Sequence, residues 1–164
     1  MCAHYSRAEL LQMALELESG AEQFYLSTAK MFSRPPLQQA LEAIARQERA
    51  HAKMYEQLLA EGSEERLDMP SGDTALYVRA MLDSEILRGL RERHGRIGSE
   101  LDALRFAVGM EKDTMLFYYG LRDFASPREL EVLETIIGQE KKHLIQVSEL
   151  LSDLIERSKR PDWG

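Results

Sequence analysis

The sequence predicts an all-α fold, a four-helix bundle built from two repeated helical hairpins with a long crossover that carries an extra short helix. Helix start and stop signals recur along the chain, whereas the alternating Val, Ile and Thr patterns of strands are nearly absent. Four of the segments that these signals delimit are about 25 residues long, or roughly 37 Å as helices. Two tight connections join them pairwise into hairpins.

The first hairpin is expected to contain helices over about 7–33 and 36–61. The first helix begins after the capping box Ser6-x-x-Glu9, in which each side chain accepts a hydrogen bond from the other residue's backbone N–H. Two consecutive prolines end this helix, because proline lacks a backbone N–H, and they also suit the first turn of the second helix. A glycine directly after the second helix is placed to terminate it.

The crossover begins with a polar stretch and continues into a shorter helical pattern over about 74–93. The second hairpin is expected to contain helices over about 100–124 and 127–159. A capping motif at Ser99 starts the third long helix, and the Ser-Pro-x-Glu motif at Ser126 is the clearest start signal in the chain. The whole chain, 1–164, is expected to form a single domain.

The two hairpins repeat one sequence pattern. Helix one contains Ala14-x-x-x-Glu18-x-x-x-x-x-Phe24-Tyr25, and the same residues recur 93 positions later in helix three, at Ala107, Glu111, Phe117 and Tyr118. Helix two contains Gln47-Glu48-x-x-His51, and these residues recur 92 positions later in helix four, at Gln139, Glu140 and His143. We therefore expect the hairpins to be related by an approximate two-fold axis, which we place along the bundle.

Composition and charge exclude several classes of protein. The formal charge is -7, which argues against a nucleic-acid partner. The longest apolar runs are a few residues, far short of the ~20 that a membrane span needs. The single cysteine, Cys2, supplies neither an internal disulfide nor a Cys-based metal site within one chain. These observations predict a cytoplasmic protein without membrane or nucleic-acid partners.

The repeated acids and histidines point to a buried metal site. In each Glu-x-x-His motif the two residues share a helix face, and the first-helix and third-helix glutamates lie on otherwise apolar stripes. Buried carboxylates need compensating positive charge, and no Lys or Arg recurs on both stripes to supply it. Two divalent cations would balance four carboxylates. The candidate ligands are Glu18, Glu48, His51, Glu111, Glu140 and His143.

Other readings of these residues compete with a metal site. A lone Glu-x-x-His in a helical protein rich in glutamate is usually a surface coincidence, but here the motif recurs inside longer matching strings. Tyr25 and Tyr118 are each expected to pack in the core. As candidate functional residues, they would donate a hydrogen bond to a ligand carboxylate or transfer an electron. Gln47 and Gln139 point about 100° away from the ligands on their own helices, so no role is assigned to them.

The combined strings resemble the rubrerythrin-like branch of the ferritin-like superfamily. This resemblance implies two iron ions, or manganese, with Glu48 and Glu140 as bridges. It implies that Glu18 with His51 binds one metal and that Glu111 with His143 binds the other. The implied activity is a di-iron oxidoreductase that reduces peroxide or dioxygen, with a role in oxidative stress. A homodimer and an external electron donor such as a rubredoxin-type protein are also implied.

Two alternatives remain open at the level of sequence. A ferroxidase or iron-storage protein like bacterioferritin shares the six-ligand pattern. Rubrerythrins place a further Glu three residues after the third-helix ligand, where this chain has Thr114, and this difference makes the predicted centre more symmetric. The other alternative is a non-catalytic module that binds or senses iron.

Overall fold

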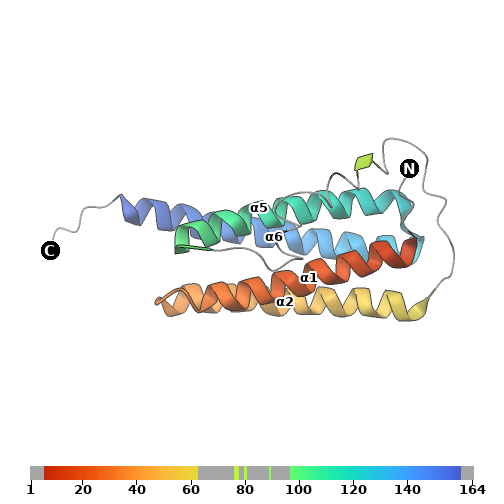
Figure 1. Cartoon of the computed structure of the whole chain (residues 1–164), viewed down its shortest axis with the longest axis horizontal. Coiled ribbons are helices and arrows are strands. Elements are labelled where there is room, and N and C mark those ends of the chain that lie inside the picture. Colours follow the sequence, from red (N-terminus) through yellow and green to blue (C-terminus); the bar gives the residue numbers. More distant parts are fainter. Residues whose placement is uncertain (1–5, 63–75, 78–79, 81–88, 90–96, 160–164) are drawn as a thin grey trace.

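The computed structural model describes residues 6–62, 76–77, 80, 89 and 97–159. Within these residues the chain forms long helices and no strand, which confirms the all-α class. Four of the described elements are long helices, and they pack side by side (Figure 1). The elements are α1 (Arg7–Ala29), α2 (Pro35–Glu61), α5 (Glu100–Leu121), the 3₁₀ turn η1 (Arg122–Phe124) and α6 (Pro127–Ser158).

The predicted caps start the helices. Ser6 and Ser126 each form a complete capping box, with Glu9 and Glu129 respectively. The Ser99 side chain accepts a hydrogen bond from the backbone N–H of Asp102 at the start of α5. These side chains satisfy backbone donors that have no partner within the helix.

The observed helix boundaries differ from the predicted ones in four places. The first helix ends at Ala29 instead of residue 33, because the N–H groups of Met31 and Phe32 bond carbonyls three residues back and tighten the chain into a turn. This turn brings Phe32 into the core. Helix α2 begins one residue early, at Pro35. Helix α5 ends at Leu121, where the tighter η1 replaces its last turn, and α6 ends at 158 rather than 159.

The predicted crossover helix over 74–93 lies largely outside the described residues. Leu76, Tyr77, Ala80 and Gly89 are described, and each of them is helical. The Tyr77 hydroxyl donates a hydrogen bond of 3.0 Å to the backbone carbonyl of Leu116 in α5. This part of the crossover therefore contacts the bundle of its own chain.

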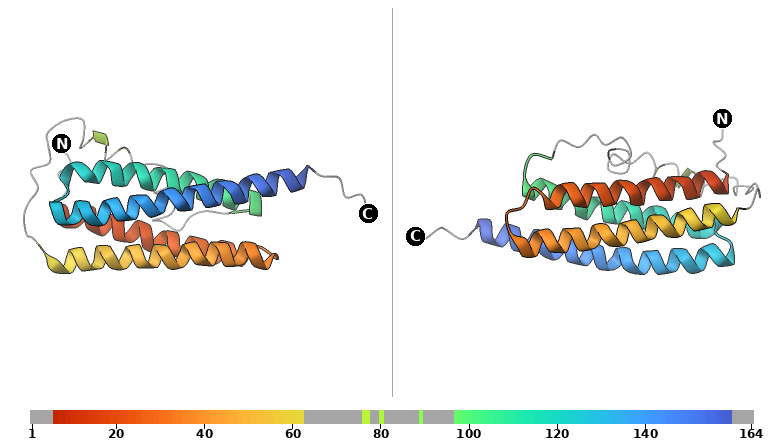
Figure 2. Two further views of the ribbon diagram at one scale, coloured as in Figure 1. Left: turned by 180° about the vertical axis from the view of Figure 1, so that it is seen from behind. Right: turned by 90° about the horizontal axis from the view of Figure 1, so that it is seen from below.

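The two hairpins are related by an axis perpendicular to the helices, which corrects the predicted axis along the bundle. Helix α2 ends and α5 begins at opposite ends of the bundle, so the equivalent helices α1 and α5 run in opposite directions, as do α2 and α6 (Figure 1). A two-fold axis along the bundle would make equivalent helices parallel. The further views agree that α1 lies beside α2 and that α5 lies beside α6 (Figure 2).

The core runs along the inward stripes of all four helices. Leu41, Ile44, Met110 and Ile136 are fully buried, as are several aromatic side chains, namely Tyr25, Tyr55, Phe117 and Tyr118. No helix among the described residues has a stretch long and apolar enough to cross a bilayer.

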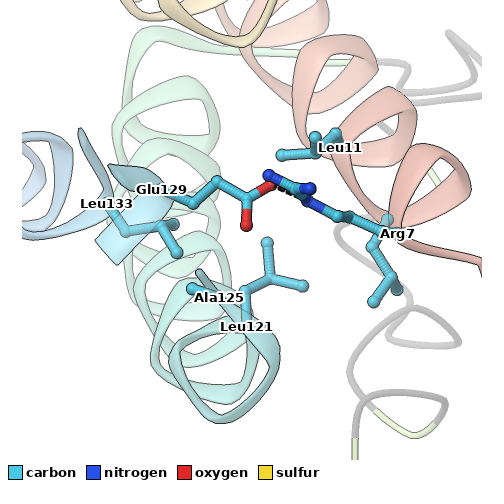
Figure 3. A pocket seen from close by; sticks show the side chains of 7 residues that line it. Arg7, Leu11, Leu121, Ala125, Glu129 and Leu133 are labelled. Carbon is cyan, nitrogen blue, oxygen red and sulfur yellow. Dashed lines mark hydrogen bonds and ion pairs between the residues drawn. The ribbon is translucent and has the colours of Figure 1, made fainter. Parts of the chain in front are cut away.

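A partly buried ion pair ties the two hairpins together at one end of the bundle. Arg7, the first residue of α1, bonds the Glu129 carboxylate and donates a 3.2 Å hydrogen bond to Ser126, so the beginnings of α1 and α6 are joined. Figure 3 shows Arg7 and Glu129 pointing toward one another across a small pocket lined by leucines. Because Glu129 is buried, its charge depends on this partner.

We predict that Arg7→Leu lowers the free energy of unfolding by about 2 kcal/mol, because it leaves the Glu129 carboxylate buried without its partner. The double variant Arg7→Leu with Glu129→Gln is expected to recover part of this loss, since glutamine is uncharged and still completes a capping box. Urea unfolding of both variants measures the effect.

Arg128→Leu is the matched control. Arg128 is 61% exposed and lies 3.8 Å from Glu61, so its loss is expected to cost less than about 0.5 kcal/mol. Equal costs for Arg7→Leu and Arg128→Leu would contradict a structural role for the Arg7–Glu129 pair.

Candidate metal centre

The six predicted ligands meet at the centre of the bundle. Each of them is at most 1% exposed. Their ligand atoms form two groups, within each of which all atoms lie within 4.8 Å of one another. The first group is Glu18, Glu48, His51 and Glu140, and the second is Glu48, Glu111, Glu140 and His143. Glu48 and Glu140 belong to both groups, which is the arrangement that bridging ligands require.

The Glu-x-x-His spacing and the packing of α2 against α6 produce this overlap. Within each helix, the histidine Nδ1 lies 3.3 Å from the carboxylate three residues before it. Across the bundle, His51 Nδ1 lies 2.8 Å from Glu140 Oε1, and His143 Nδ1 lies 3.1 Å from Glu48 Oε1. The two imidazole rings are stacked, with centroids 5.7 Å apart. Each histidine therefore faces both shared carboxylates.

The repeated tyrosines orient the two remaining glutamates. The Tyr25 hydroxyl of α1 donates a short hydrogen bond to Glu111 of α5, and the Tyr118 hydroxyl of α5 donates one to Glu18 of α1. Each bond holds one carboxylate oxygen and crosses from one hairpin to the other. The tyrosines thus contact candidate ligands from the opposite hairpin.

The sequence analysis missed two residues that contact the site. His51 Nε2 donates to Gln139 Oε1 at 2.5 Å, and His143 Nε2 donates to Gln47 Oε1 at 3.2 Å. An amide oxygen only accepts hydrogen bonds, so each glutamine keeps a hydrogen on the Nε2 atom of its histidine. The Nδ1 atom of the same histidine then faces the carboxylates. Their repetition 92 residues apart was the available signal. The glutamines point away from the ligands of their own helices, which hid their role, because each one bonds a histidine of the facing helix.

Burial and mutual repulsion control protonation in the cluster. Burial, then the charges of neighbouring carboxylates, raises the pKa of Glu48 and of Glu111 well above the usual range. Burial also opposes ionisation of Glu140, but hydrogen bonds from His143 and His51 outweigh it and lower its pKa to about 2. For His51, bonds to the surrounding carboxylates outweigh burial and raise its pKa above the usual range. The metal-free cluster thus favours protonated Glu48, Glu111 and His51.

Unpartnered oxygen atoms indicate that cations fit this site. Among the described residues, Glu48 Oε1 and Glu140 Oε1 are buried, and neither accepts a well-aligned hydrogen bond, although a histidine Nδ1 lies 3.1 Å from the first and 2.8 Å from the second. Both belong to the glutamates shared by the two groups. A buried polar atom without a partner costs about 1–3 kcal/mol, and a divalent cation bound between the carboxylates would satisfy both oxygens. Oxygen and imidazole nitrogen ligands in one site suit iron and manganese.

We predict that the metal-free protein loses stability as the pH rises from 5 to 8. Because the pKa values of Glu48 and Glu111 are raised in the folded state, the folded protein binds more protons than the unfolded protein above about pH 4.5. The free energy of unfolding therefore falls as the pH rises, by up to about 1.4 kcal/mol per pH unit for each group. Chemical denaturation across this range, with chelator present, measures the slope. Glu111→Gln is expected to flatten it, and Glu56→Gln, on the exposed face of α2, is expected to leave it unchanged. Stability that increases over this range would contradict the protonation described above.

Comparisons with known proteins agree with this geometry. A search of curated proteins found no match. A crystal structure described as a ferritin-like diiron-carboxylate protein from Thermotoga maritima matches 91% of this chain and 96% of its own, with a TM-score of 0.68 and 24% identity. At this identity the likeness establishes the fold, a ferritin-like helical bundle. The rubrerythrin family model matches residues 9–151, nearly the whole of the four-helix bundle, so the chain belongs to the rubrerythrin family.

Proposed function

We propose that the cluster binds two iron ions and that the protein is a di-iron oxidoreductase. The observation that carries this proposal is the overlap of the two ligand groups, each with three carboxylates and one histidine and with Glu48 and Glu140 in common. Four carboxylates carry -4, two divalent ions carry +4 and neutral histidines add nothing. The bound centre is therefore close to neutral, as a buried site requires.

Each side chain has a defined part in this proposal. Glu18 with His51 would hold one ion, Glu111 with His143 would hold the other, and Glu48 and Glu140 would bridge them. Tyr25 and Tyr118 orient the outer glutamates, and the two glutamines orient the histidines. The surrounding apolar core limits water at the cluster.

The proposed reaction is the reduction of peroxide or dioxygen. Bound Fe(II) ions would supply two electrons, and the protons taken up by the reduced oxygen atoms would come from solvent, because carboxylates that bind metal have lost theirs. The Tyr25 hydroxyl beside the cluster stays protonated, because burial raises its pKa. Repeated turnover then needs an electron donor. Cys2 is the only cysteine, so this chain contains no Cys-ligated iron of its own, and we propose an external rubredoxin-type protein. A homodimer and a cytoplasmic location stay predictions.

A ferroxidase or storage role is the second candidate. It is favoured by the symmetry of the six ligands and by Thr114, which stands one turn after Glu111 and, unlike a glutamate, adds no fifth carboxylate. In this role Fe(II) is the substrate as well as the resident metal.

We predict that the wild-type protein binds two Fe(II) per chain under anaerobic conditions. Glu48→Ala and Glu140→Ala are each expected to abolish dinuclear loading, because each removes an atom from both groups. Elemental analysis after desalting measures the stoichiometry. Glu56→Ala is the matched control on the exposed face of α2. Two metals retained in Glu48→Ala would refute the assignment of the bridges.

Mixing the Fe(II) protein separately with peroxide and with dioxygen distinguishes the candidate functions. Fast oxidation by peroxide, reversed by an added reductant, is the expected result for a peroxidase. Consumption of dioxygen with growth of an iron mineral would instead identify a storage protein. Inertness to both oxidants would identify a binding module. Absorbance of oxidised iron, followed by stopped flow, provides the measurement.

We predict that Gln139→Ala weakens metal binding about 10- to 100-fold, because the His51 ring loses the partner that fixes its orientation. Gln47→Ala is expected to act on His143 in the same way. Competition with a chelator measures the affinities. Gln12→Ala, on the exposed face of α1, is the control. Unchanged affinity in both site variants would show that the glutamines do not position the histidines.

A further inference from the structure

Two buried hydroxyl groups break the two-fold symmetry of the site, and the larger change is at Tyr55. Tyr55 lies on α2, four residues after His51, and the 92-residue repeat places Val147 at the equivalent position of α6. Both side chains are fully buried. The candidate ligands, the tyrosines that bond them and the glutamines all recur in both hairpins. Thr114 on α5, whose repeat equivalent is Ala21, is a second buried hydroxyl without a counterpart. Of these two hydroxyls, only that of Tyr55 is a buried group without a hydrogen-bond partner among the described residues.

The Tyr55 hydroxyl lies beside the Glu18 half of the cluster. Its ring packs against the Tyr118 ring, with centroids 5.7 Å apart, and Tyr118 in turn bonds Glu18. Burial, followed by the negative charge of Glu18, raises the pKa of Tyr55 well above its usual range. The group therefore stays protonated and can donate a hydrogen bond.

This hydroxyl makes no hydrogen bond of acceptable geometry to any residue that the structure describes, although the Tyr118 hydroxyl lies close enough to affect its pKa. Tyrosine hydroxyls normally find a partner when buried, and leaving one without a partner costs about as much as losing a hydrogen bond. The single hydrogen of the Tyr118 hydroxyl is already donated to Glu18. Val147 shows that the fold accepts an apolar side chain at the equivalent place. Packing alone therefore does not explain why a hydroxyl is present.

We propose that the Tyr55 hydroxyl donates a hydrogen bond to a small ligand of the peroxide or dioxygen class beside Glu18 and His51. The inference rests on the proposed di-iron function and deepens it. Tyr55 supplies the Glu18 half with a buried hydroxyl that has no partner among the described residues, so the oxidant binds at the Glu18 half in preference to the Glu111 half. Tyr55 is thus a residue that distinguishes two otherwise matching metal positions.

The test uses azide as the probe and Co(II) as a metal that undergoes no oxidation under the conditions. The wild-type chain is loaded with two Co(II), and azide is titrated while the visible absorption of cobalt is followed. Tyr55→Phe keeps the ring and removes the hydroxyl, so it is expected to raise the Kd for azide about three- to tenfold. The bound cobalt is expected to stay at two per chain. Tyr119→Phe, a half-buried neighbour of Tyr118, is expected to match the wild type.

A crystal structure of the cobalt protein with azide gives a second measurement. The expected result is an azide nitrogen within about 3.2 Å of the Tyr55 hydroxyl oxygen. An unchanged Kd in a fully loaded Tyr55→Phe variant overturns the inference alone, as does a Tyr55 hydroxyl that donates to Tyr118 instead. A wild-type chain that binds no cobalt or iron overturns the proposed function and, with it, this inference.

Discussion

The placement of four carboxylates inside an apolar helical bundle is the constraint on which the rest of the structure depends. Glu18, Glu48, Glu111 and Glu140 are nearly inaccessible to solvent, and isolated buried charges of this kind are costly. In the metal-free protein, protons and the two histidines reduce this cost. The same groups become ligands once protons leave, so metal binding and proton release are coupled. The cluster consequently lowers the stability of the metal-free fold, and the same carboxylates allow the fold to bind cations.

Hydrogen bonds that cross between hairpins hold this cluster in shape. Each tyrosine bonds a glutamate of the opposite hairpin, and each glutamine bonds a histidine of the opposite hairpin. The Arg7–Glu129 pair adds a further link at one end. Orientation of each candidate ligand therefore depends on how the hairpins pack together, and a local change within one hairpin affects groups on both sides of the site.

Much of the fold and all six candidate ligands could be predicted from the sequence, because caps are local patterns and the repeated motifs can be matched directly along the chain. The crossing contacts could not. Gln47 points away from Glu48 on its own helix, and only the facing α6 brings it to His143. The direction of the two-fold axis also depends on where the crossover returns the chain, which no local pattern specifies. The end of α1 was missed because backbone hydrogen bonds around Met31 close a turn before the prolines are reached.

The perpendicular two-fold axis has a consequence for how such a site can change. Two identical, separate hairpins related by this axis would present the same six ligands, since each hairpin supplies three residues to its own group and one to the other. In such a pair, every substitution would alter both halves at once. Joining the hairpins in one chain lets a substitution fall on a single half. The contrast of Tyr55 with Val147 is a difference that a symmetric pair of identical hairpins could not hold.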